Sequence, residues 1–299
     1  NLLTNTVLAS TCPVLLAPAM NTDMWQQQSV QRNWRQIQTD PRYHVANPSE
    51  GVLACDRVGT GRMAEPEELL PQIVSLLHTH GKRDLTGKRV LISAGGTQEF
   101  LDPVRFIGNP STGKMGVALA QAASHRGAIV TLVHASIEPH LLASLRNRLI
   151  PITSAIEMQQ AMRECLPDAD WIVMAAAVAD VKPTTYSAEK LAKGDLPDRL
   201  SLSPVPDIVA ELATLKQPYQ RLIGFAAQSG DIITPALEKL QRKKLDAIVT
   251  NPIDQPDSGF GSDTNQAVFL DRSGRQVYIS LGSKLQVAHQ ILDLVQEIP

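Results

Sequence analysis

A glycine-rich segment at residues 93–116, SAGGTQEFLDPVRFIGNPSTGKMG, holds the first residues whose types and spacing could do chemistry. It follows a short apolar run, KRVLI, and leads into a helix-like run, VALAQAASHRG. Backbone phosphate sites are built from a strand, a glycine-rich loop and a helix start. Residues 108–114 fit G-x-x-x-x-G-K, but Met115 stands where a P-loop has the Ser or Thr that holds magnesium. The segment therefore predicts a nucleotide site that differs from the common P-loop.

Gly95 and Gly96 directly follow the first apolar run, so backbone N–H groups at this turn could face an anion. A tight turn of any α/β protein would explain the same two residues. A dinucleotide site would add an acidic residue after the next strand, at 129–134, to bind a ribose hydroxyl. The first carboxylate after that strand is Glu138, so an NAD(P)-dependent Rossmann oxidoreductase is the disfavoured alternative.

A run of small residues, AAAVAD at 175–180, follows another strand-like run at 171–174. Small residues at the end of a strand let a flat ligand approach the backbone. Asp180 could then bind a ribose hydroxyl or a metal ion. A helix cap or close packing would explain the same aspartate equally well.

Two groups of lysines could meet phosphates: Lys190 with Lys193, and Lys239 with Lys243 and Lys244. Positions 239 and 243 share one face of a helix because they are four residues apart. A triphosphate needs several such cations to balance its charge. A run of basic residues is nevertheless more often only a solvated surface.

Cys55 lies in a second glycine-rich stretch, GVLACDRVGTGRM. A lone cysteine is usually a buried, small apolar residue. A mobile loop with Asp56, Arg57 and Arg62 nearby favours a reactive thiol instead.

The elements that must position these residues follow from hydrophobic patterning. After residue 88, strand-length apolar runs alternate with helical patterns, which predicts an α/β fold with a doubly wound, Rossmann-like parallel sheet. The turn Arg272-Ser273-Gly274 between apolar runs predicts an antiparallel hairpin near the C-terminus. The expected strands are 90–93, 129–134, 171–176, 222–226 and 247–250, the hairpin strands 267–271 and 276–280, and the helices 115–125, 155–165, 206–215, 235–245 and 284–298.

The first 80 residues have a separate pattern. Strands are expected at 13–17 and 43–46, a helical stretch near MWQQQSVQRNWRQIQ, a loop over 50–63 and an amphipathic helix at 66–80. The polar stretch 81–87 is the expected linker between domains at 1–80 and 88–299. The chain begins NLLTNTVLA without a Met, so we expect its start to lie within a larger domain.

Composition excludes several classes of function. With 43% hydrophobic and 19% charged residues, the 299-residue chain suits a globular protein with ample core. A net charge of −2 and 4% aromatic residues do not favour a nucleic-acid surface. Three widely spaced cysteines predict no disulfide framework and a reducing, cytoplasmic setting. No apolar run approaches the ~20 residues of a membrane span, and no signal peptide is visible.

Together these motifs resemble a family of bifunctional coenzyme A biosynthesis proteins, in which phosphopantothenoylcysteine decarboxylase is fused to phosphopantothenate–cysteine ligase. The ligase motifs are KRVLISAGGTQEFLDPVRFIGNPSTGKMG, AAAVADVKP, AEKLAKGD, PDIVAEL, GFAAQS and KKLDAIVTNPI, in family order. The decarboxylase motifs are PAMNTDMW and GVLACDRVGTGRM. The resemblance implies that residues 1–80 are the C-terminal part of a flavodoxin-like α/β decarboxylase domain and that residues 88–299 are a CTP-dependent ligase.

The resemblance implies a two-step ligase reaction that uses CTP and not ATP. 4′-Phosphopantothenate attacks the α-phosphate of CTP to give an acyl-cytidylate, and the amine of L-cysteine then displaces CMP. Asn109 and Arg105 match positions tied to the acyl-cytidylate step, Mg²⁺ is expected with the triphosphate, and Asp180 is the candidate metal ligand. The residues assigned to the nucleotide are Gly95, Gly96, Met174, Ala175, Ala176, Asp180, Lys190, Pro206, Asp207, Ile208, Val209, Phe225, Lys239 and Lys243.

For the decarboxylase half, the resemblance implies oxidation of the cysteine moiety by FMN. Asn21 in PAMN matches the residue that binds the substrate carboxylate, with Met20 beside it, and Cys55 matches the proton donor on a substrate-covering flap. The family's flavin-binding segments and active-site histidine precede PAMN, so we expect an intact ligase and an incomplete decarboxylase. The resemblance also implies homo-oligomers, with ligase dimers and decarboxylase trimers.

The chain departs from the family pattern at three places: Thr112 replaces a Ser, Gln228-Ser229 replaces Glu-Thr, and Ala192 replaces a Lys. A non-catalytic flavoprotein-like assembly module is the alternative from another class. The retained Asn109 and Lys239 argue against this alternative.

Overall fold

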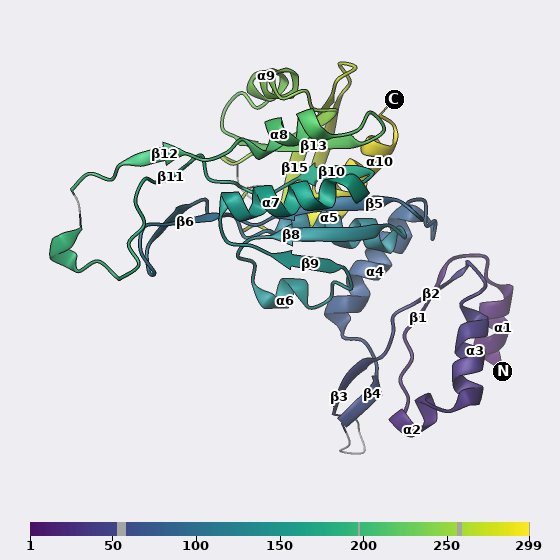
Figure 1. Ribbon diagram of the computed structural model, residues 1–299. Helices are drawn as coiled ribbons and strands as arrows, with labels where there is room; N and C mark the ends of the chain where they lie inside the picture. The colour runs from purple at the N-terminus through teal and green to yellow at the C-terminus, as the bar shows by residue number, and fades with distance from the viewer. Residues whose placement is uncertain (53–57, 197, 256–258, 299) are drawn as a thin grey trace. The chain divides into compact units, whose positions relative to one another are not determined.

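The computed structural model describes residues 1–52, 58–196, 198–255 and 259–298 (Figure 1). The chain divides into two compact units, Asn1–Asp84 and Leu85–Pro299. None of the helices within the described ranges has the length and apolar character needed to cross a membrane.

The first unit combines helices with two pairs of short strands. β1 (Val14–Leu16) pairs in parallel with β2 (Tyr43–Val45), which confirms the two strands expected there. The loop expected over 50–63 is wrong in its described part, because β3 (Ser49–Val52) and β4 (Val58–Arg62) form an antiparallel ribbon. The helices of this unit are α1 (Leu2–Ala9), α2 (Thr22–Trp25), α3 (Gln28–Ile37) and α4 (Pro66–Thr79).

The second unit is built on an eight-stranded sheet with the order β16-β15-β14-β13-β10-β5-β8-β9. The six strands from β14 to β9 are parallel, and β15 and β16 add the expected antiparallel hairpin at one edge. The predicted fold class is therefore confirmed. The strands are β5 (Arg89–Ala94), β8 (Ile129–His134), β9 (Arg148–Pro151), β10 (Trp171–Met174), β13 (Arg221–Gln228), β14 (Ala247–Pro252), β15 (Thr264–Asp271) and β16 (Gln276–Ser283).

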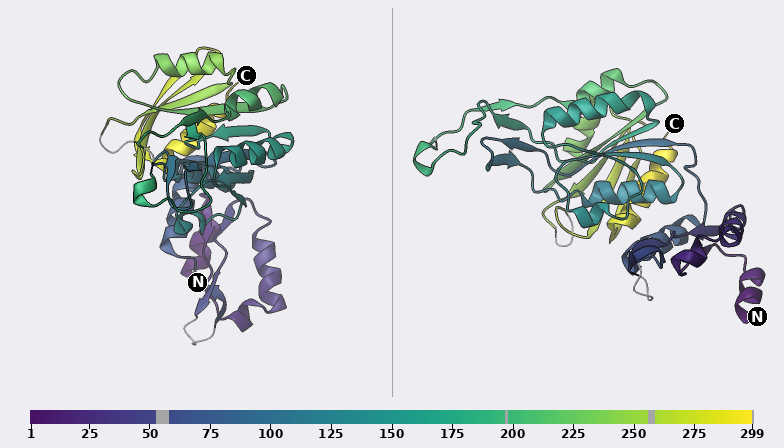
Figure 2. Two further views of the ribbon diagram at one scale, coloured as in Figure 1. Left: turned by 60° about the vertical axis from the view of Figure 1, so that its left-hand side comes forward. Right: turned by 60° about the horizontal axis from the view of Figure 1, so that its bottom comes forward.

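Helices cover both faces of this sheet, as Figures 1 and 2 show. α5 and α10 pack against each other on one face, while α7, α8 and α9 share a buried apolar core with the sheet on the other. Ser154 and Ser283 begin α7 and α10 with complete capping boxes, which fix where these helices start. The helices are α5 (Lys114–His125), α6 (Pro139–Leu142), α7 (Ala155–Cys165), α8 (Ile208–Leu215), α9 (Thr234–Arg242) and α10 (Lys284–Gln296), with 3₁₀ turns η1 (Leu166–Asp168) and η2 (Lys193–Asp195).

The direction in which successive strands are added to the sheet reverses between β5 and β10. From β5 the chain moves outward through β8 to β9, whereas from β10 it moves the other way through β13 to β14. Ligands of open parallel sheets bind at such a switch point, outside the carboxyl ends of the strands. Ser93 and Met174 are register partners in the two central strands, so the residues after them are the ones this topology places at the switch point.

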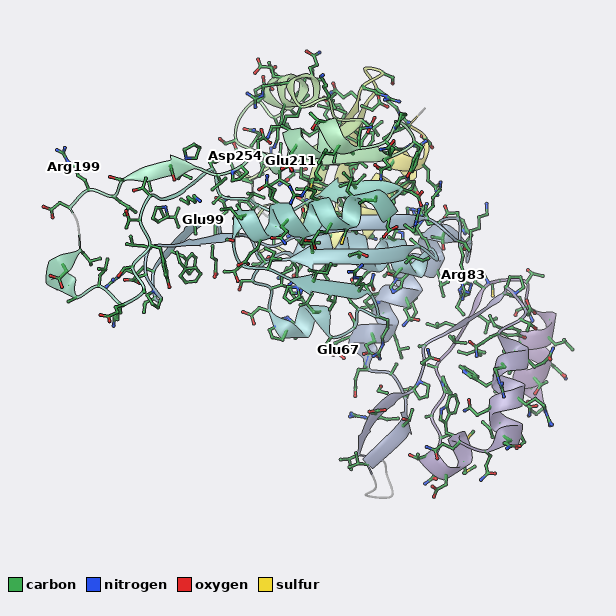
Figure 3. All side chains as sticks on the ribbon, viewed as in Figure 1. Glu67, Arg83, Glu99, Arg199, Glu211 and Asp254 are labelled. Carbon is green, nitrogen blue, oxygen red and sulfur yellow. The ribbon has the colours of Figure 1, made fainter. Side chains whose placement is uncertain are left out.

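Two thin ribbons leave the sheet together and form an arm, which extends to one side in Figure 1. One ribbon is β6 (Gln98–Phe100) with β7 (Phe106–Gly108), and the other is β11 (Val181–Pro183) with β12 (Leu202–Pro204). Glu99 is buried at the base of the arm, where its carboxylate accepts a hydrogen bond from the Ala155 N–H at 2.8 Å (Figure 3). The arm is thereby tied to the start of α7.

Candidate functional site

A cleft of about 600 Å³ opens in the second unit at the switch point. Its walls come from the start of α5, the loop after β10, the start of α8, and side chains of β13 and α9. Of the predicted nucleotide residues, the cleft is lined by Met174, Ala175, Ala176, Asp180, Pro206, Asp207, Ile208, Val209, Phe225, Lys239 and Lys243, together with Asn109. The fold thus brings together residues that lie up to 134 positions apart (Asn109 to Lys243) in the sequence.

The start of α5 presents backbone N–H groups to this cleft. Its N-cap is Gly113, with φ of 74°, and it supplies no side-chain hydrogen bond to the first turn. A Cβ at this position would lie 2.4 Å from the Ile137 side chain, so both backbone conformation and space require glycine. The open first turn carries the positive end of the helix dipole, which suits an anionic ligand.

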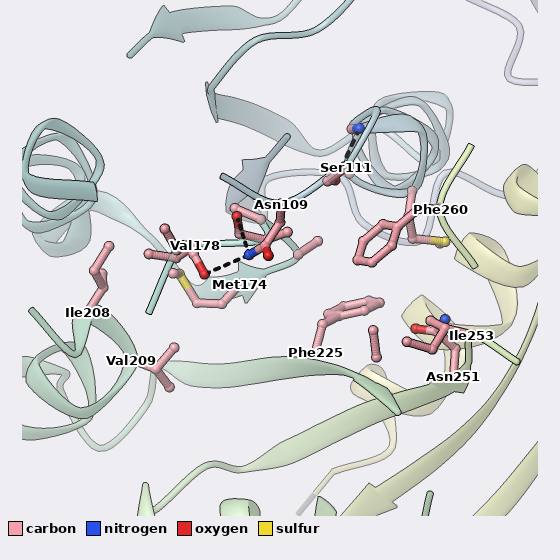
Figure 4. Close-up of a pocket in the computed structure, with 18 of the residues that line it drawn as sticks. Asn109, Ser111, Met174, Val178, Ile208, Val209, Phe225, Asn251, Ile253 and Phe260 are labelled. Carbon is pink, nitrogen blue, oxygen red and sulfur yellow. Dashed lines mark hydrogen bonds between the residues drawn. The ribbon is translucent and has the colours of Figure 1, made fainter. Parts of the chain in front are cut away.

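Asn109 is held at the edge of the cleft by the loop after β10. Its Nδ2 donates to the backbone oxygen of Val178 at 3.1 Å and to that of Ala177 at 3.4 Å (Figure 4). Gly96 lies behind it, because a Cβ on Gly96 would be 2.5 Å from the Asn109 carbonyl oxygen. Gly95 and Gly96 are not among the residues that line the cleft, so direct contact of their N–H groups with a nucleotide stays a prediction.

The cationic wall of the cleft is formed by Lys239, which lies in α9, and Lys243, which is the C-cap of that helix. Lys239 Nζ donates to the Phe225 carbonyl at 2.9 Å, and burial together with repulsion from Lys243 lowers the pKa of Lys239. Lys243 Nζ lies 2.9 Å from a carboxylate oxygen of Asp207, which also caps α8 by accepting from the Ala210 N–H. Burial opposes ionisation of Asp207, but its hydrogen bonds from Lys243 and Ala210 outweigh that effect and lower its pKa.

Asp180 lines the cleft with an exposed side chain, while its backbone oxygen accepts from the Val205 N–H at 3.1 Å. Among the described residues no three His, Cys, Asp or Glu side chains gather to hold a metal ion. A single carboxylate nevertheless fits Mg²⁺, which is usually bound through one or two carboxylates and otherwise by substrate phosphates and water. A magnesium ion carried by a triphosphate is thus compatible with this wall.

Arg105 and Lys190 do not line the cleft. Arg105 lies on the arm, where it pairs with the buried Asp102 at 2.5 Å and donates to the Leu191 carbonyl at 3.2 Å. Asp102 accepts in turn from the Leu191 N–H at 3.3 Å, so the pair anchors the loop that carries Lys190. The roles expected for Arg105 and Lys190 stay predictions.

The predicted decarboxylase residues belong to the first unit. Asn21 caps α2 by accepting from the Asp23 N–H at 2.9 Å, and Met20 donates its N–H to the Gly61 carbonyl of β4 at 2.8 Å. The Asn21 loop and β4 are therefore neighbours. Cys55 lies outside the described residues.

Sequence reasoning missed several side chains of the cleft, among them Asn251, Phe260 and Lys284. Lys284 carried a detectable signal, because it follows the capping serine of a predicted helix. A cation in the first turn of a helix is disfavoured by the helix dipole, so a lysine at this position indicates a role other than stabilising the helix.

Comparison with known proteins places the chain in a family. The model of the DNA/pantothenate metabolism flavoprotein C-terminal domain matches residues 85–298, and the Flavoprotein model matches residues 1–78. The coenzyme A biosynthesis bifunctional protein CoaBC of Bacillus subtilis is 41% identical over 295 residues, which cover 98% of this chain and 71% of that protein. A cysteine/cysteine sulfinic acid decarboxylase from an unknown prokaryotic organism is also 41% identical, over 98% of this chain and 81% of its own.

Among solved structures, the C-terminal domain of a CoaBC protein aligns with a TM-score of 0.59 and 31% identity. The alignment covers 72% of this chain and 97% of that domain. The chain therefore belongs to the DNA/pantothenate metabolism flavoprotein family, and the bifunctional coenzyme A biosynthesis enzymes of that family match it over nearly its whole length.

Proposed function

We propose that the unit Leu85–Pro299 joins 4′-phosphopantothenate to L-cysteine at the expense of CTP. One observation carries the proposal: the switch-point cleft places the open start of α5 and the Lys239–Lys243 pair on the walls of one cavity. Such a cavity offers N–H groups and ammonium groups to the phosphates of a nucleotide. The matching coenzyme A biosynthesis proteins support the choice of substrates.

The first step forms the activated acyl group. A carboxylate oxygen of 4′-phosphopantothenate attacks the α-phosphorus of CTP, and the bond from that phosphorus to the bridging oxygen of pyrophosphate breaks. The start of α5 and the cations of α9 would offset the charge that collects on the departing pyrophosphate. Asn109, whose Nδ2 is anchored on the loop after β10, would help to orient the reacting groups through its side-chain oxygen.

The second step forms the amide. The cysteine amine attacks the acyl carbon, the carbon–oxygen bond to CMP breaks, and the amine proton is lost to solvent or to CMP. Small residues at 175–177 leave the backbone of the cleft wall open to the acyl-cytidylate. Magnesium would enter as part of the CTP substrate and take Asp180 as its protein ligand.

The first unit would be the C-terminal part of a flavin-dependent decarboxylase, as its match to the Flavoprotein model suggests. Its residues are compatible with a bound group, because the buried Thr22 hydroxyl beside Asn21 has no hydrogen-bond partner among the residues described. FMN, when bound, would supply the oxidising equivalents. Asn21 would orient the substrate carboxylate, and β4 would support it through Gly61. Visible flavin absorbance in the purified protein tests this part.

We propose that the chain also forms a homo-oligomer. The arm exposes Val104, Phe106 and Tyr186, each about half accessible to solvent, which supports burial against another copy. Light scattering of the purified chain measures the oligomeric state, and a monomer at working concentration would contradict this part alone.

The ligase proposal is tested with CTP, L-cysteine and 4′-phosphopantothenate. We expect CMP and pyrophosphate in equal amounts, with both absent when cysteine and phosphopantothenate are both left out. ATP in place of CTP measures nucleotide selectivity, and NADH provides a control that should not stabilise the protein thermally. A folded protein that releases no CMP would overturn the ligase proposal.

A further inference from the structure

Two lysines occupy the same position at the start of neighbouring helices. Lys114 is the first residue of α5 and Lys284 is the first residue of α10, and these two helices pack against each other. A cation in this position is disfavoured by the helix dipole. Lys284 is nevertheless only 7% exposed. Burial and the nearby Lys114 ammonium lower the pKa of Lys284 to about 8.

Both ammonium groups bind one short segment, Gly259–Asp263. Lys114 Nζ donates to the Gly261 carbonyl at 3.0 Å and lies 2.6 Å from an Asp263 carboxylate oxygen. Lys284 Nζ donates to the carbonyls of Gly259, at 3.3 Å, and Ser262. The Lys284 backbone N–H adds a bond to the Asp263 carbonyl at 3.0 Å. The two helix starts thus fix the segment at four of its five residues.

The fifth residue of the segment is Phe260, which lines the cleft with 43% of its surface exposed. In Figure 4 its ring lies across the cleft from that of Phe225. The backbone of Phe225 is held in place by Lys239, because the Phe225 carbonyl accepts a hydrogen bond from the Lys239 ammonium. The cleft therefore has two aromatic walls, each attached to a lysine-bonded backbone segment.

We propose that Phe260 is the second aromatic wall of the nucleobase site, opposite Phe225, and that Lys114 and Lys284 are positioning residues that hold it there. A flat heteroaromatic ring between two such walls gains stacking on both faces. The inference rests on the proposed use of a nucleotide substrate. It assigns the two lysines to the Gly259–Asp263 segment and not to direct contact with phosphate.

The test measures steady-state kinetics of the full chain with each substrate varied in turn. We expect Phe260→Ala to raise KM for CTP by roughly 5- to 100-fold, with KM for cysteine and for phosphopantothenate nearly unchanged. Phe260→Tyr retains the ring and should stay close to wild type. Lys284→Met and Lys114→Met should raise KM for CTP in the same selective way, while the exposed Lys88→Met serves as the matched control.

A double-variant cycle separates positioning from direct phosphate binding. If Lys284 acts through Phe260, then Lys284→Met should have little further effect on KM for CTP in the Phe260→Ala background. Binding of tripolyphosphate, which lacks a base, should change little in Phe260→Ala. Additive effects of the two substitutions, or equal loss of CTP and tripolyphosphate binding in Phe260→Ala, would overturn the inference.

The outcome stays interpretable if a lysine variant unfolds, because Phe260→Ala alone then decides. A wild-type protein that neither binds CTP nor releases CMP refutes the proposed function. If the wild-type protein is active and Phe260→Ala leaves KM for CTP unchanged, only the role assigned to Phe260 and its two lysines is refuted.

Discussion

Gly96→Ala is the substitution that most directly tests how the fold sets the position of Asn109. The new Cβ would lie 2.5 Å from the Asn109 carbonyl oxygen, and contacts below 3.0 Å are essentially never seen. The two groups must therefore separate by at least 0.5 Å (3.0 minus 2.5). Gly96 cannot retreat freely, because it bridges Ser136 on one side and Ala177 on the other. The displacement should fall on the segment that carries Asn109.

Two quantities follow from this displacement. Overpacking of a closed site destabilises a protein by about 1–3 kcal/mol, which urea unfolding followed by circular dichroism would detect. A misplacement near 1 Å can lower a catalytic rate by about 100-fold. We expect Gly96→Ala to reduce kcat for CMP release by about 10- to 100-fold, because Asn109 would lose its fixed relation to the Ala177 and Val178 carbonyls.

Gly51→Ala is the matched control. Among the described residues its Cβ would meet only Arg62 side-chain atoms at 3.5 Å and beyond, which is ordinary contact, and Gly51 belongs to the other unit. Asn109→Ala sets the upper limit of the effect on kcat. A Gly96→Ala protein with wild-type kcat and stability would show that the Asn109 segment is not fixed by this contact, and the reasoning from the close approach would fail.

Three further predictions concern charge. Burial lowers the pKa of His125 to about 4, so the unfolded chain binds more protons than the folded chain between pH 4 and 6.5. The contribution of His125 to the free energy of unfolding should be fully present above pH 6.5 and fall by on the order of 2 kcal/mol as the pH drops to 4. Urea titrations of His125→Gln should lack this loss. Lys239→Met should raise KM for CTP roughly tenfold or more, since a charge-assisted hydrogen bond is removed, whereas Lys88→Met should not. Chelation of Mg²⁺ should abolish CMP release, and Asp180→Asn should raise the Mg²⁺ concentration needed to restore it; an unchanged requirement in Asp180→Asn would remove this residue as the metal ligand.

The main sheet could be predicted from the sequence because its inner strands are continuous apolar runs between helical patterns. β5 and β10 are buried along nearly their full length, as parallel strands covered on both faces must be. β9 was missed, since an edge strand of four residues with Arg148 and Pro151 at its ends has little apolar pattern. The two ribbons of the arm were missed for the same reason, because each strand has only three residues.

The site residues that belong to contiguous sequence motifs could be predicted, whereas those that reach the cleft through tertiary contacts could not. The start of α8 and the loop after β10 are contiguous motifs, and both line the cleft. Phe260 and Lys284 belong to no such motif and reach the cleft only because α10 packs beside α5. Gly96 could be recognised as important, yet its close approach to Asn109 depends on a chain reversal through the arm that local patterning does not reveal.

The distribution of cations over the cleft has a physical reason if both substrates are anions. At an effective dielectric constant of 20, two unit charges 4 Å apart repel by about 4 kcal/mol, so a carboxylate does not approach a phosphate without compensation. The compensating groups come from opposite faces of the sheet, with the open start of α5 on one and Lys239 and Lys243 on the other. The loop at 174–179 between them carries no charged side chain. An arrangement of this kind lets two anions meet over a neutral backbone surface while each keeps its own cationic partner.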